Sequence, residues 1–111
     1  MPTFVERHFV KELEANPNFK KADYEKALRE TFMKMDVLLL TPEGKKEVSE
    51  IQAEMRKKDN GPKYDEESHA GCTANVVLIT PEKIYCANAG DSRAVACVNT
   101  KTEPLSYDHK P

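Results

Sequence analysis

The sequence lacks most of the features that mark specialised classes of protein. Its 111 residues contain no run of about 18 apolar residues, so we expect no membrane-spanning helix and no membrane partner. The net charge is -2, without the basic excess that indicates a nucleic-acid partner or the acidic block typical of a tail. The N-terminal stretch "MPTFVERHF" lacks the apolar core of a signal peptide. These absences predict one globular, intracellular domain, cytoplasmic or nuclear.

Motifs for nucleophilic catalysis and nucleotide binding are also absent. The chain has no G-x-S-x-G sequence, which would indicate a serine nucleophile, and no G-x-x-x-x-G-K phosphate loop. The three cysteines, Cys72, Cys86 and Cys97, form no C-x-x-C pair, so they predict neither a zinc site nor a disulfide framework. We interpret them as buried, reduced thiols, and an oxidised pair between Cys86 and Cys97 across a hairpin is the alternative.

The first half of the chain has the periodicity of amphipathic helices. The strongest pattern predicts a helix from residue 24 to 41, with Asp23 as its N-cap and the following proline as its end. A shorter helix is predicted over about residues 3–15, ended by the sequence NPN, and a surface helix over about residues 44–57. The apolar faces of these helices are formed by Phe4, Val5, Phe9, Leu13, Tyr24, Ala27, Leu28, Thr31, Phe32, Met35, Leu38, Leu39, Val48, Ile51 and Met55.

The second half has the pattern of β-strands, after a charged loop predicted over residues 58–68. The stretch "TANVVLIT" (73–80) is predicted as a strand buried on both faces, followed by strands in "KIYCANA", "SRAVACV" and, shorter, "PLSY". Gly90-Asp91 is predicted to close a type II′ hairpin between the second and third strands, because glycine accepts positive φ. The fold class is therefore α+β, with N-terminal helices followed by an antiparallel β-meander over about residues 72–106.

The inventory of reactive side chains is thin. His8 is predicted to lie on the surface or partly packed, and His69 at a loop-to-strand junction without a partner. Asp108, just past a strand end, could bind a hard divalent cation through oxygen, although spacing alone favours the alternative of a solvated loop carboxylate. Arg93 is predicted to pair with Asp91 or a neighbouring acid and to hold the end of the hairpin.

Several motifs resemble a known family. The stretches "AGCTANVVLI", "YCANAGDSRAV" and "LSYDHKP", in this order and at these separations, resemble the central motifs of the PP2C (PPM) family of metal-dependent protein serine/threonine phosphatases. The helical half, from "FVERHFVKEL" to "KALRETFMKMDVLLL", is similar to the two helices that precede those strands in the family. The resemblance covers essentially the whole chain and departs slightly at Ala70, where the family often has serine.

The resemblance implies a fold and a reaction. The fold is part of a two-sheet β-sandwich flanked by helices on both sides, an α-β-β-α arrangement. The reaction is hydrolysis of phosphoserine and phosphothreonine in phosphoprotein substrates. Two Mg²⁺ or Mn²⁺ ions held by aspartates would lower the pKa of a bridging water and neutralise charge on the phosphoryl oxygens. No covalent intermediate is implied, which agrees with the missing nucleophile motif.

Carried over residue by residue, the resemblance places most of the site outside this sequence. The family's first-strand acid, its "DGHGG" motif and its later aspartates have no counterpart here, so we expect no catalytic residue and no activity from the chain alone. Asp108 matches an aspartate that in some family members helps to bind a third, weaker metal ion. Gly90, Asp91, Ser92 and Arg93 match the family's "GDSR" motif. In the family this motif resembles a structural hairpin and not a group that takes part in the chemistry.

A non-catalytic interpretation stands beside the phosphatase fragment. The chain is then a truncated relative that binds a partner or pairs with itself. Missing strands would leave sheet edges and an apolar sheet face uncovered, which favours self-association. Under both interpretations we expect little of the Asp108 side chain to be buried. We therefore expect Asp108→Ala to leave folding almost unchanged.

Overall fold

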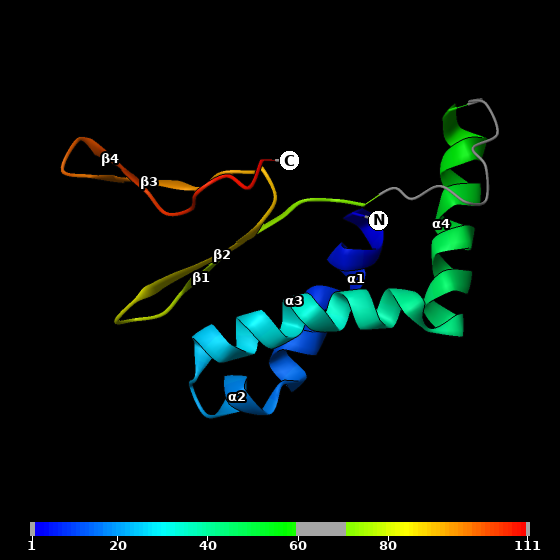
Figure 1. Ribbon diagram of the computed structural model, residues 1–111, viewed down its shortest axis with the longest axis horizontal. Coiled ribbons are helices and arrows are strands. Elements are labelled where there is room, and N and C mark those ends of the chain that lie inside the picture. Colours follow the sequence, from blue (N-terminus) through cyan, green and yellow to red (C-terminus); the bar gives the residue numbers. More distant parts are fainter. Residues whose placement is uncertain (1, 60–70, 111) are drawn as a thin grey trace. The chain divides into compact units, whose positions relative to one another are not determined.

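The computed structural model describes residues 2–59 and 71–110, and Figure 1 shows their helices and strands. These residues form two compact units, Met1–Gly71 and Cys72–Pro111, which are described separately below. The first unit is helical and the second is built of antiparallel strands, so the predicted α+β class is confirmed. In the described parts of the chain, no helix has both the length and the apolar character needed to cross a membrane.

Four helices form the first unit: α1 (Pro2–Ala15), α2 (Pro17–Lys20), α3 (Tyr24–Leu40) and α4 (Pro42–Asp59). The three longer helices lie where the sequence predicted them, and α4 runs two residues past its predicted end into the predicted loop. Residues 60–68 of that loop, together with His69 and Ala70, lie outside the described residues. The short helix α2 was not predicted. Asn16 caps it by accepting the backbone N–H of Asn18 at 2.8 Å, and Pro17 stands in its first turn.

The core of the first unit lies between the apolar faces of α1, α3 and α4. The ring of Phe9 meets that of Phe32 edge to face, with centroids 5.5 Å apart, so α1 and α3 pack directly. Most of the predicted helix faces are buried or half-buried, but Met55 of α4 is 54% exposed. Among the described residues of this unit, the buried side chains of the core are those of Phe4, Phe9, Leu13, Ala27, Leu28, Thr31, Met35 and Ile51.

The two ends of α3 differ from each other in how they are capped. Asp23 stands at the N-cap position as predicted, but its side chain accepts no hydrogen bond from the first turn. At the other end, Thr41 takes an extended conformation before Pro42, as the proline requires. The Thr41 hydroxyl donates to the carbonyl of Leu38 at 2.6 Å and accepts the N–H of Gly44 at 3.0 Å. This threonine therefore joins the end of α3 to the start of α4.

The second unit contains four strands: β1 (Ala74–Ile79), β2 (Ile84–Ala89), β3 (Val95–Val98) and β4 (Lys101–Pro104). β1 pairs with β2, and β3 pairs with β4, so the described strands form two separate two-stranded sheets and not one continuous meander. The predicted hairpin at Gly90-Asp91 is therefore wrong, since β2 and β3 do not pair. The physical reason is that the chain after β2 bonds to the C-terminal segment instead.

The second hairpin turns at Asn99 and Thr100. Both residues have positive φ, 50° and 66°, which is the backbone of a two-residue type I′ turn. The fourth strand consequently begins at Lys101 and ends at Pro104, earlier than the "PLSY" stretch that the sequence predicted. The tight turn at Asn99 and Thr100 brings Lys101–Pro104 opposite β3, so the strand forms before the "PLSY" stretch begins.

Burial in the second unit is lower than the sequence predicted. Ile79 is 73% exposed and Val77 is 42% exposed, so β1 is not buried on both faces. A two-stranded sheet supplies no second layer to cover both of its faces, which explains the difference. The prediction of buried cysteines is also wrong for two of the three: Cys72 and Cys97 are exposed, and Cys86 is half-buried. All three are free thiols, and Cys86 faces Val77 across its sheet instead of Cys97.

Candidate functional site

The "AGDSR" and "SYDHK" motifs lie side by side in the second unit. The N–H of Leu105 donates to the carbonyl of Ala94 at 2.9 Å, and the N–H of His109 donates to the carbonyl of Gly90 at 2.8 Å. The segments 90–94 and 105–109 therefore run alongside each other in opposite directions. This contact brings together every site residue that the sequence singled out in the C-terminal half.

Asn88, at the end of β2, connects these two segments. Its Nδ2 donates to the carbonyl of Gly90 at 3.1 Å and to the carbonyl of Tyr107 at 3.0 Å. One side-chain amide thus satisfies a backbone acceptor on each segment, which fixes their separation.

Asn75 and Ser106 extend this network into the sheet. Asn75 faces Asn88 across β1 and β2, and its Nδ2 donates to Asn88 Oδ1 at 3.0 Å and to Ser106 Oγ at 3.1 Å. Ser106 is buried, with 7% of its surface exposed, and its Oγ also accepts the N–H of Ala94 at 3.0 Å. None of these three side chains was predicted from the sequence. Asparagines that interrupt two apolar strands were the available signal, since a polar group in such a position needs a partner.

Gly90 occupies a position that requires glycine. Its φ is 109°, which L side chains rarely adopt, so the predicted positive φ is confirmed although the predicted hairpin is not. An added Cβ would lie 2.5 Å from Cγ2 of Thr73, closer than any ordinary contact. The backbone N–H of Gly90 also faces Nδ1 of His109 at 3.3 Å. The absence of a side chain at Gly90 therefore permits the close approach of Thr73.

Arg93 and Asp108 form a two-pronged ion pair between the segments. Nε and Nη2 of Arg93 donate to Oδ1 and Oδ2 of Asp108 at 3.1 Å and 2.7 Å. The Asp108 side chain is only 13% exposed, whereas that of Arg93 is 62% exposed. The expectation that Asp108 buries little is wrong, because its side chain is mostly buried and both of its oxygens accept hydrogen bonds from a residue 15 positions away in the sequence. Arg93 was predicted to pair with Asp91 or with a neighbouring acid. The structure pairs it with Asp108 and not with Asp91.

The ion pair determines the protonation of both partners. The guanidinium of Arg93 lowers the pKa of Asp108 through its hydrogen bonds, against the opposing effect of burial, and Lys110 lowers it further. Conversely, the hydrogen bonds to Asp108 raise the pKa of Arg93. Asp108 is therefore a carboxylate, and Arg93 a cation, throughout the ordinary range of pH.

The other two members of the "GDSR" motif differ in their contacts. The hydroxyls of Ser92 and Thr73 share a hydrogen bond of 2.6 Å, which joins the motif to the chain just before β1. Asp91 is exposed and makes no side-chain hydrogen bond or ion pair within residues 2–59 and 71–110. The hydrogen bond between Ser92 and Thr73 therefore has a structural role, since it holds two segments of the chain together.

The described residues contain no complete set of ligands for a metal ion. Nowhere in the described ranges do three His, Cys, Asp or Glu side chains gather closely enough to hold a cation. Asp108 carries oxygen donors of the type that Mg²⁺ and Mn²⁺ prefer. It is a single carboxylate, and both of its oxygens already accept hydrogen bonds from Arg93.

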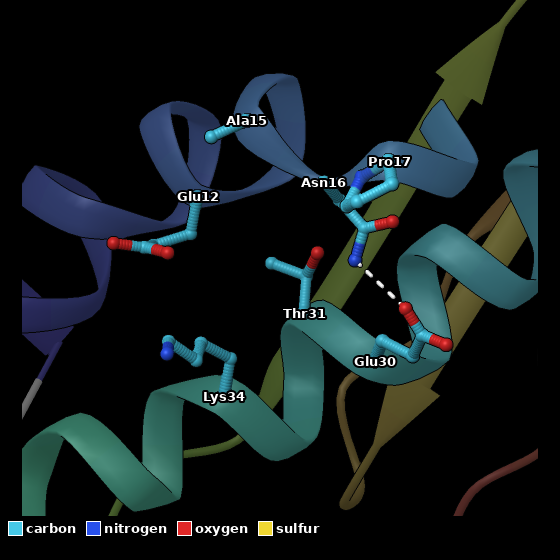
Figure 2. Close-up of a pocket in the computed structure, with 7 residues that line it drawn as sticks. All are labelled: Glu12, Ala15, Asn16, Pro17, Glu30, Thr31 and Lys34. Atoms are coloured by element: carbon cyan, nitrogen blue, oxygen red, sulfur yellow. Dashed lines mark hydrogen bonds between the residues drawn. The ribbon is translucent and has the colours of Figure 1, made fainter. Parts of the chain in front are cut away.

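The first unit contains a pocket of 320 Å³, which Figure 2 shows between α1, α2 and α3. At one end Glu30 accepts hydrogen bonds of 2.9 Å from the side-chain amides of Asn16 and Asn18, which lower the pKa of its carboxyl. The buried Thr31 hydroxyl donates to the carbonyl of Ala27 at 2.8 Å, so it is not poised as a nucleophile. The hydrogen bonds from Asn16 and Asn18 to Glu30 connect α2 and its N-cap to α3. The pocket is lined by Glu12, Ala15, Asn16, Pro17, Glu30, Thr31 and Lys34.

His8 is half-buried, as predicted, and makes structural contacts. Its ring lies against Phe4 with centroids 4.5 Å apart, and its Nε2 lies 2.7 Å from a carboxylate oxygen of Glu47 on α4. The hydrogen bond from His8 lowers the pKa of Glu47, with a smaller contribution from Arg7. This group joins α1 to α4.

Comparison with known proteins identifies the family. A sequence model described as "Protein phosphatase 2C" matches residues 2–111. The chain belongs to the protein phosphatase 2C family. No solved structure matches the chain. The family assignment accounts for the juxtaposed "AGDSR" and "DHK" motifs, on which the predicted resemblance depended.

Curated relatives of the protein phosphatase 2C family share much of this sequence. "Probable protein phosphatase 2C 4" and "Protein phosphatase 2C 1" of Paramecium tetraurelia are each 54% identical over 108 residues. "Protein phosphatase 2C homolog 2" of Hypocrea jecorina is 40% identical over 94 residues. The two Paramecium alignments cover 97% of this chain and 33% of each relative, and the Hypocrea alignment covers 85% and 17%. The chain thus spans about a third of the length of the Paramecium phosphatases that it matches.

The Arg93–Asp108 pair predicts a loss of stability in acid. An unfolded aspartate has a pKa of about 3.9, and the folded pKa of Asp108 is lower, so the folded chain binds fewer protons. The contribution of the pair is fully present above about pH 5 and is lost as the pH falls through the folded pKa. We expect the stability difference between the parent chain and Asp108→Asn to be largest near neutral pH and to shrink below about pH 4. Urea denaturation at a series of pH values measures it.

The matched control for this prediction is Glu25→Gln. Glu25 pairs with Arg29 at 3.0 Å, but both side chains are more than two-thirds exposed, at 71% and 79%. Exposed pairs of this kind contribute little, so this variant should differ little from the parent at any pH. A difference between parent and Asp108→Asn that stays constant across the pH range would contradict the role assigned to the ion pair.

Proposed function

We propose that this chain forms part of a phosphatase domain that hydrolyses phosphoserine and phosphothreonine in phosphoproteins with Mg²⁺ or Mn²⁺. The observation that carries the proposal is the family match over residues 2–111, together with relatives that are named protein phosphatases. Both units, residues 1–111 as a whole, are assigned to that one domain. Two bound ions would supply an activated water and neutralise charge on the phosphoryl group.

The residues of this chain position the domain's motifs and do not perform the bond cleavage. Asn88, Asn75 and Ser106 hold the segments 90–94 and 105–109 in register, and Gly90 permits the close approach of Thr73. In this proposal the main metal ligands are contributed from outside these residues. The three free thiols favour a reducing, intracellular setting, in the cytoplasm or the nucleus.

We assign the role of a metal ligand to Asp108. Its carboxylate is a hard oxygen donor at the junction of the two motifs, and its low pKa keeps it ionised. A single protein ligand predicts weak binding, in the millimolar range of sites with few charged ligands. The role of Asp108 is accordingly that of an accessory ligand.

A chimera tests the proposed function. The aligned 108 residues of Protein phosphatase 2C 1 from Paramecium are replaced by the corresponding residues of this chain. We expect the chimera to hydrolyse p-nitrophenyl phosphate and a phosphothreonine peptide with Mn²⁺, and to lose this activity in a chelator. The isolated chain, shown to be folded by circular dichroism, should have no activity under the same conditions.

Two results would contradict the proposal. Metal-dependent turnover by the isolated chain, retained through repurification, would mean that it contains a site without outside ligands. A folded chimera that binds Mn²⁺ but does not turn over would mean that this segment is not interchangeable with that of an active phosphatase. In that case a defined oligomer of the isolated chain, measured by sedimentation, would favour the self-associating module.

A further inference from the structure

The pocket between α1, α2 and α3 has a size that suits a small ligand. Its volume of 320 Å³ lies at the lower end of the range for ligand sites in proteins. Figure 2 shows Glu12 and Lys34 at one end of the pocket. Asn16 and Glu30 lie at the other end, and Thr31 lies between the two ends. The lining therefore carries one more negative charge than positive, which favours a ligand with a net positive charge.

At the Glu30 end, one carboxylate oxygen is available to a ligand. The side-chain amides of Asn16 and Asn18 both donate to Oε2, at 2.9 Å, and Oε1 accepts no hydrogen bond from residues 2–59 or 71–110. The two amides lower the pKa of Glu30, with a smaller contribution from the charge of Lys26, so the carboxyl is ionised at neutral pH. This end of the pocket thus offers a charged acceptor whose complement is a cationic donor.

The opposite end of the pocket carries charges of both signs. Glu12 of α1 is half-buried and Lys34 of α3 is exposed, and neither side chain makes a hydrogen bond or an ion pair in the part of the chain that the structure describes. A carboxylate and an ammonium that line one site in this way are complementary to a ligand with an ammonium and a carboxylate side by side. The α-carbon of a free amino acid carries these two groups.

The middle of the pocket suits a short aliphatic chain. Ala15 and Pro17 contribute apolar surface to its lining. The buried hydroxyl of Thr31 already donates to the carbonyl of Ala27 at 2.8 Å, so within the pocket its oxygen can only accept. Methylene groups of a ligand would therefore meet apolar surface between the two charged ends.

We propose that this pocket binds a free α-amino acid with a cationic side chain, of the chemical class of lysine. The side-chain ammonium of the ligand donates to Oε1 of Glu30, its α-ammonium pairs with Glu12, and its α-carboxylate pairs with Lys34. An ammonium suits Glu30 better than a guanidinium does, because only one oxygen is available and a guanidinium fork engages two. The binding is additional to the proposed phosphatase function and does not depend on it.

Titration of L-lysine into the folded 111-residue chain tests this inference. Binding is followed by the backbone amide chemical shifts of residues 12–17 and 30–34. We expect saturable shifts that are largest in these two segments, with half-saturation in the millimolar range because the charges lie partly in water. L-norleucine lacks only the side-chain ammonium of lysine, and cadaverine lacks only the carboxylate. Each should bind at least about tenfold more weakly than lysine, the effect of one lost hydrogen bond between charged groups.

Two variants connect each end of the pocket to one group of the ligand. Glu30→Gln should weaken the binding of lysine at least about tenfold and leave that of norleucine unchanged. Glutamine keeps an oxygen that can accept from Asn16 and Asn18, so the variant removes the charge and retains the connection to α2. Lys34→Met should weaken the binding of lysine and norleucine, which carry the carboxylate, and should not weaken that of cadaverine.

The matched controls are Glu25→Gln and Lys45→Met, which remove the same charges from exposed side chains outside the pocket. Both should leave the half-saturating concentration of lysine unchanged. An equal loss of lysine binding in Glu30→Gln and Glu25→Gln would overturn the inference, since general charge would then explain the effect. Shifts that increase without saturating would overturn it as well, and so would equal binding of lysine, norleucine and cadaverine by the parent chain.

The comparison of the three ligands on the parent chain requires no substitution, so it decides the question even if a variant does not fold. The outcome is also separate from the proposed function. An active chimera that binds no lysine would leave the phosphatase function standing and remove only the amino-acid site. Specific binding of lysine together with an inactive chimera would leave the amino-acid site standing.

Discussion

Replacing Gly90 with alanine should lower the free energy of unfolding by about 2–6 kcal/mol. The φ of 109° at this position costs a residue with a side chain about 1–3 kcal/mol. The new Cβ would also lie 2.5 Å from Cγ2 and 2.9 Å from Cβ of Thr73, and relief of such overpacking costs a further 1–3 kcal/mol, roughly. Urea denaturation followed by circular dichroism measures the loss.

Two comparisons separate the causes of this effect. Gly71→Ala adds the same methyl group where nothing lies within 4 Å, so it should change stability by less than about 0.5 kcal/mol. Thr73→Ser removes Cγ2 but keeps the hydroxyl that bonds to Ser92, so it should recover part of the loss in Gly90→Ala. If Gly90→Ala and Gly71→Ala were equally mild, the close approach of Gly90 to Thr73 would be refuted.

Gly44→Ala should destabilise the helical unit by at least about 2 kcal/mol. An added Cβ at Gly44 would lie 1.9 Å from the carbonyl oxygen of Leu38 and 2.9 Å from its carbonyl carbon. These are backbone atoms at the end of α3, so relief requires one helix to shift against the other. Alanine is the better helix former by up to about 1 kcal/mol, but this gain is smaller than the cost of the clash. Thermal and urea unfolding of the chain measure the net change.

The control for Gly44 is an exposed position on the same helix. Ser49→Ala replaces a weaker helix former by alanine where the side chain faces solvent, and it should change stability by no more than about 0.5 kcal/mol. Should Gly44→Ala instead stabilise the chain as a simple gain in helix propensity, α3 and α4 would not meet at Leu38 as described.

The helices were predictable because their signals are local. Apolar spacing located α1 and α3, and Pro42 separated α3 from α4. The sequence NPN was interpreted as the end of a helix, yet Asn16 and Pro17 also begin α2. The same residue types serve both purposes, so only the direction of the Asn16 side chain, toward the N–H of Asn18, distinguished the two.

The strand pairing was less predictable than the strands themselves. Gly90 was correctly expected to have positive φ, but this conformation serves a close approach to Thr73 and not a hairpin. The carbonyls of Gly90 and Ala94 accept backbone N–H groups from His109 and Leu105, which lie 19 and 11 positions further along the chain. Such partners leave no trace in the local spacing from which the hairpin was inferred.

The sequence by itself determined where the three longer helices and the first three strands form, that Gly90 adopts positive φ, and which family the chain resembles. These properties depend on neighbouring residues, through periodicity, capping and turn chemistry. Only the tertiary structure decided which polar groups meet: Arg93 with Asp108, and Asn88 with Asn75. The reason is that a charged or amide side chain has many potential partners along a chain, and only the folded backbone decides which of them comes within hydrogen-bond distance.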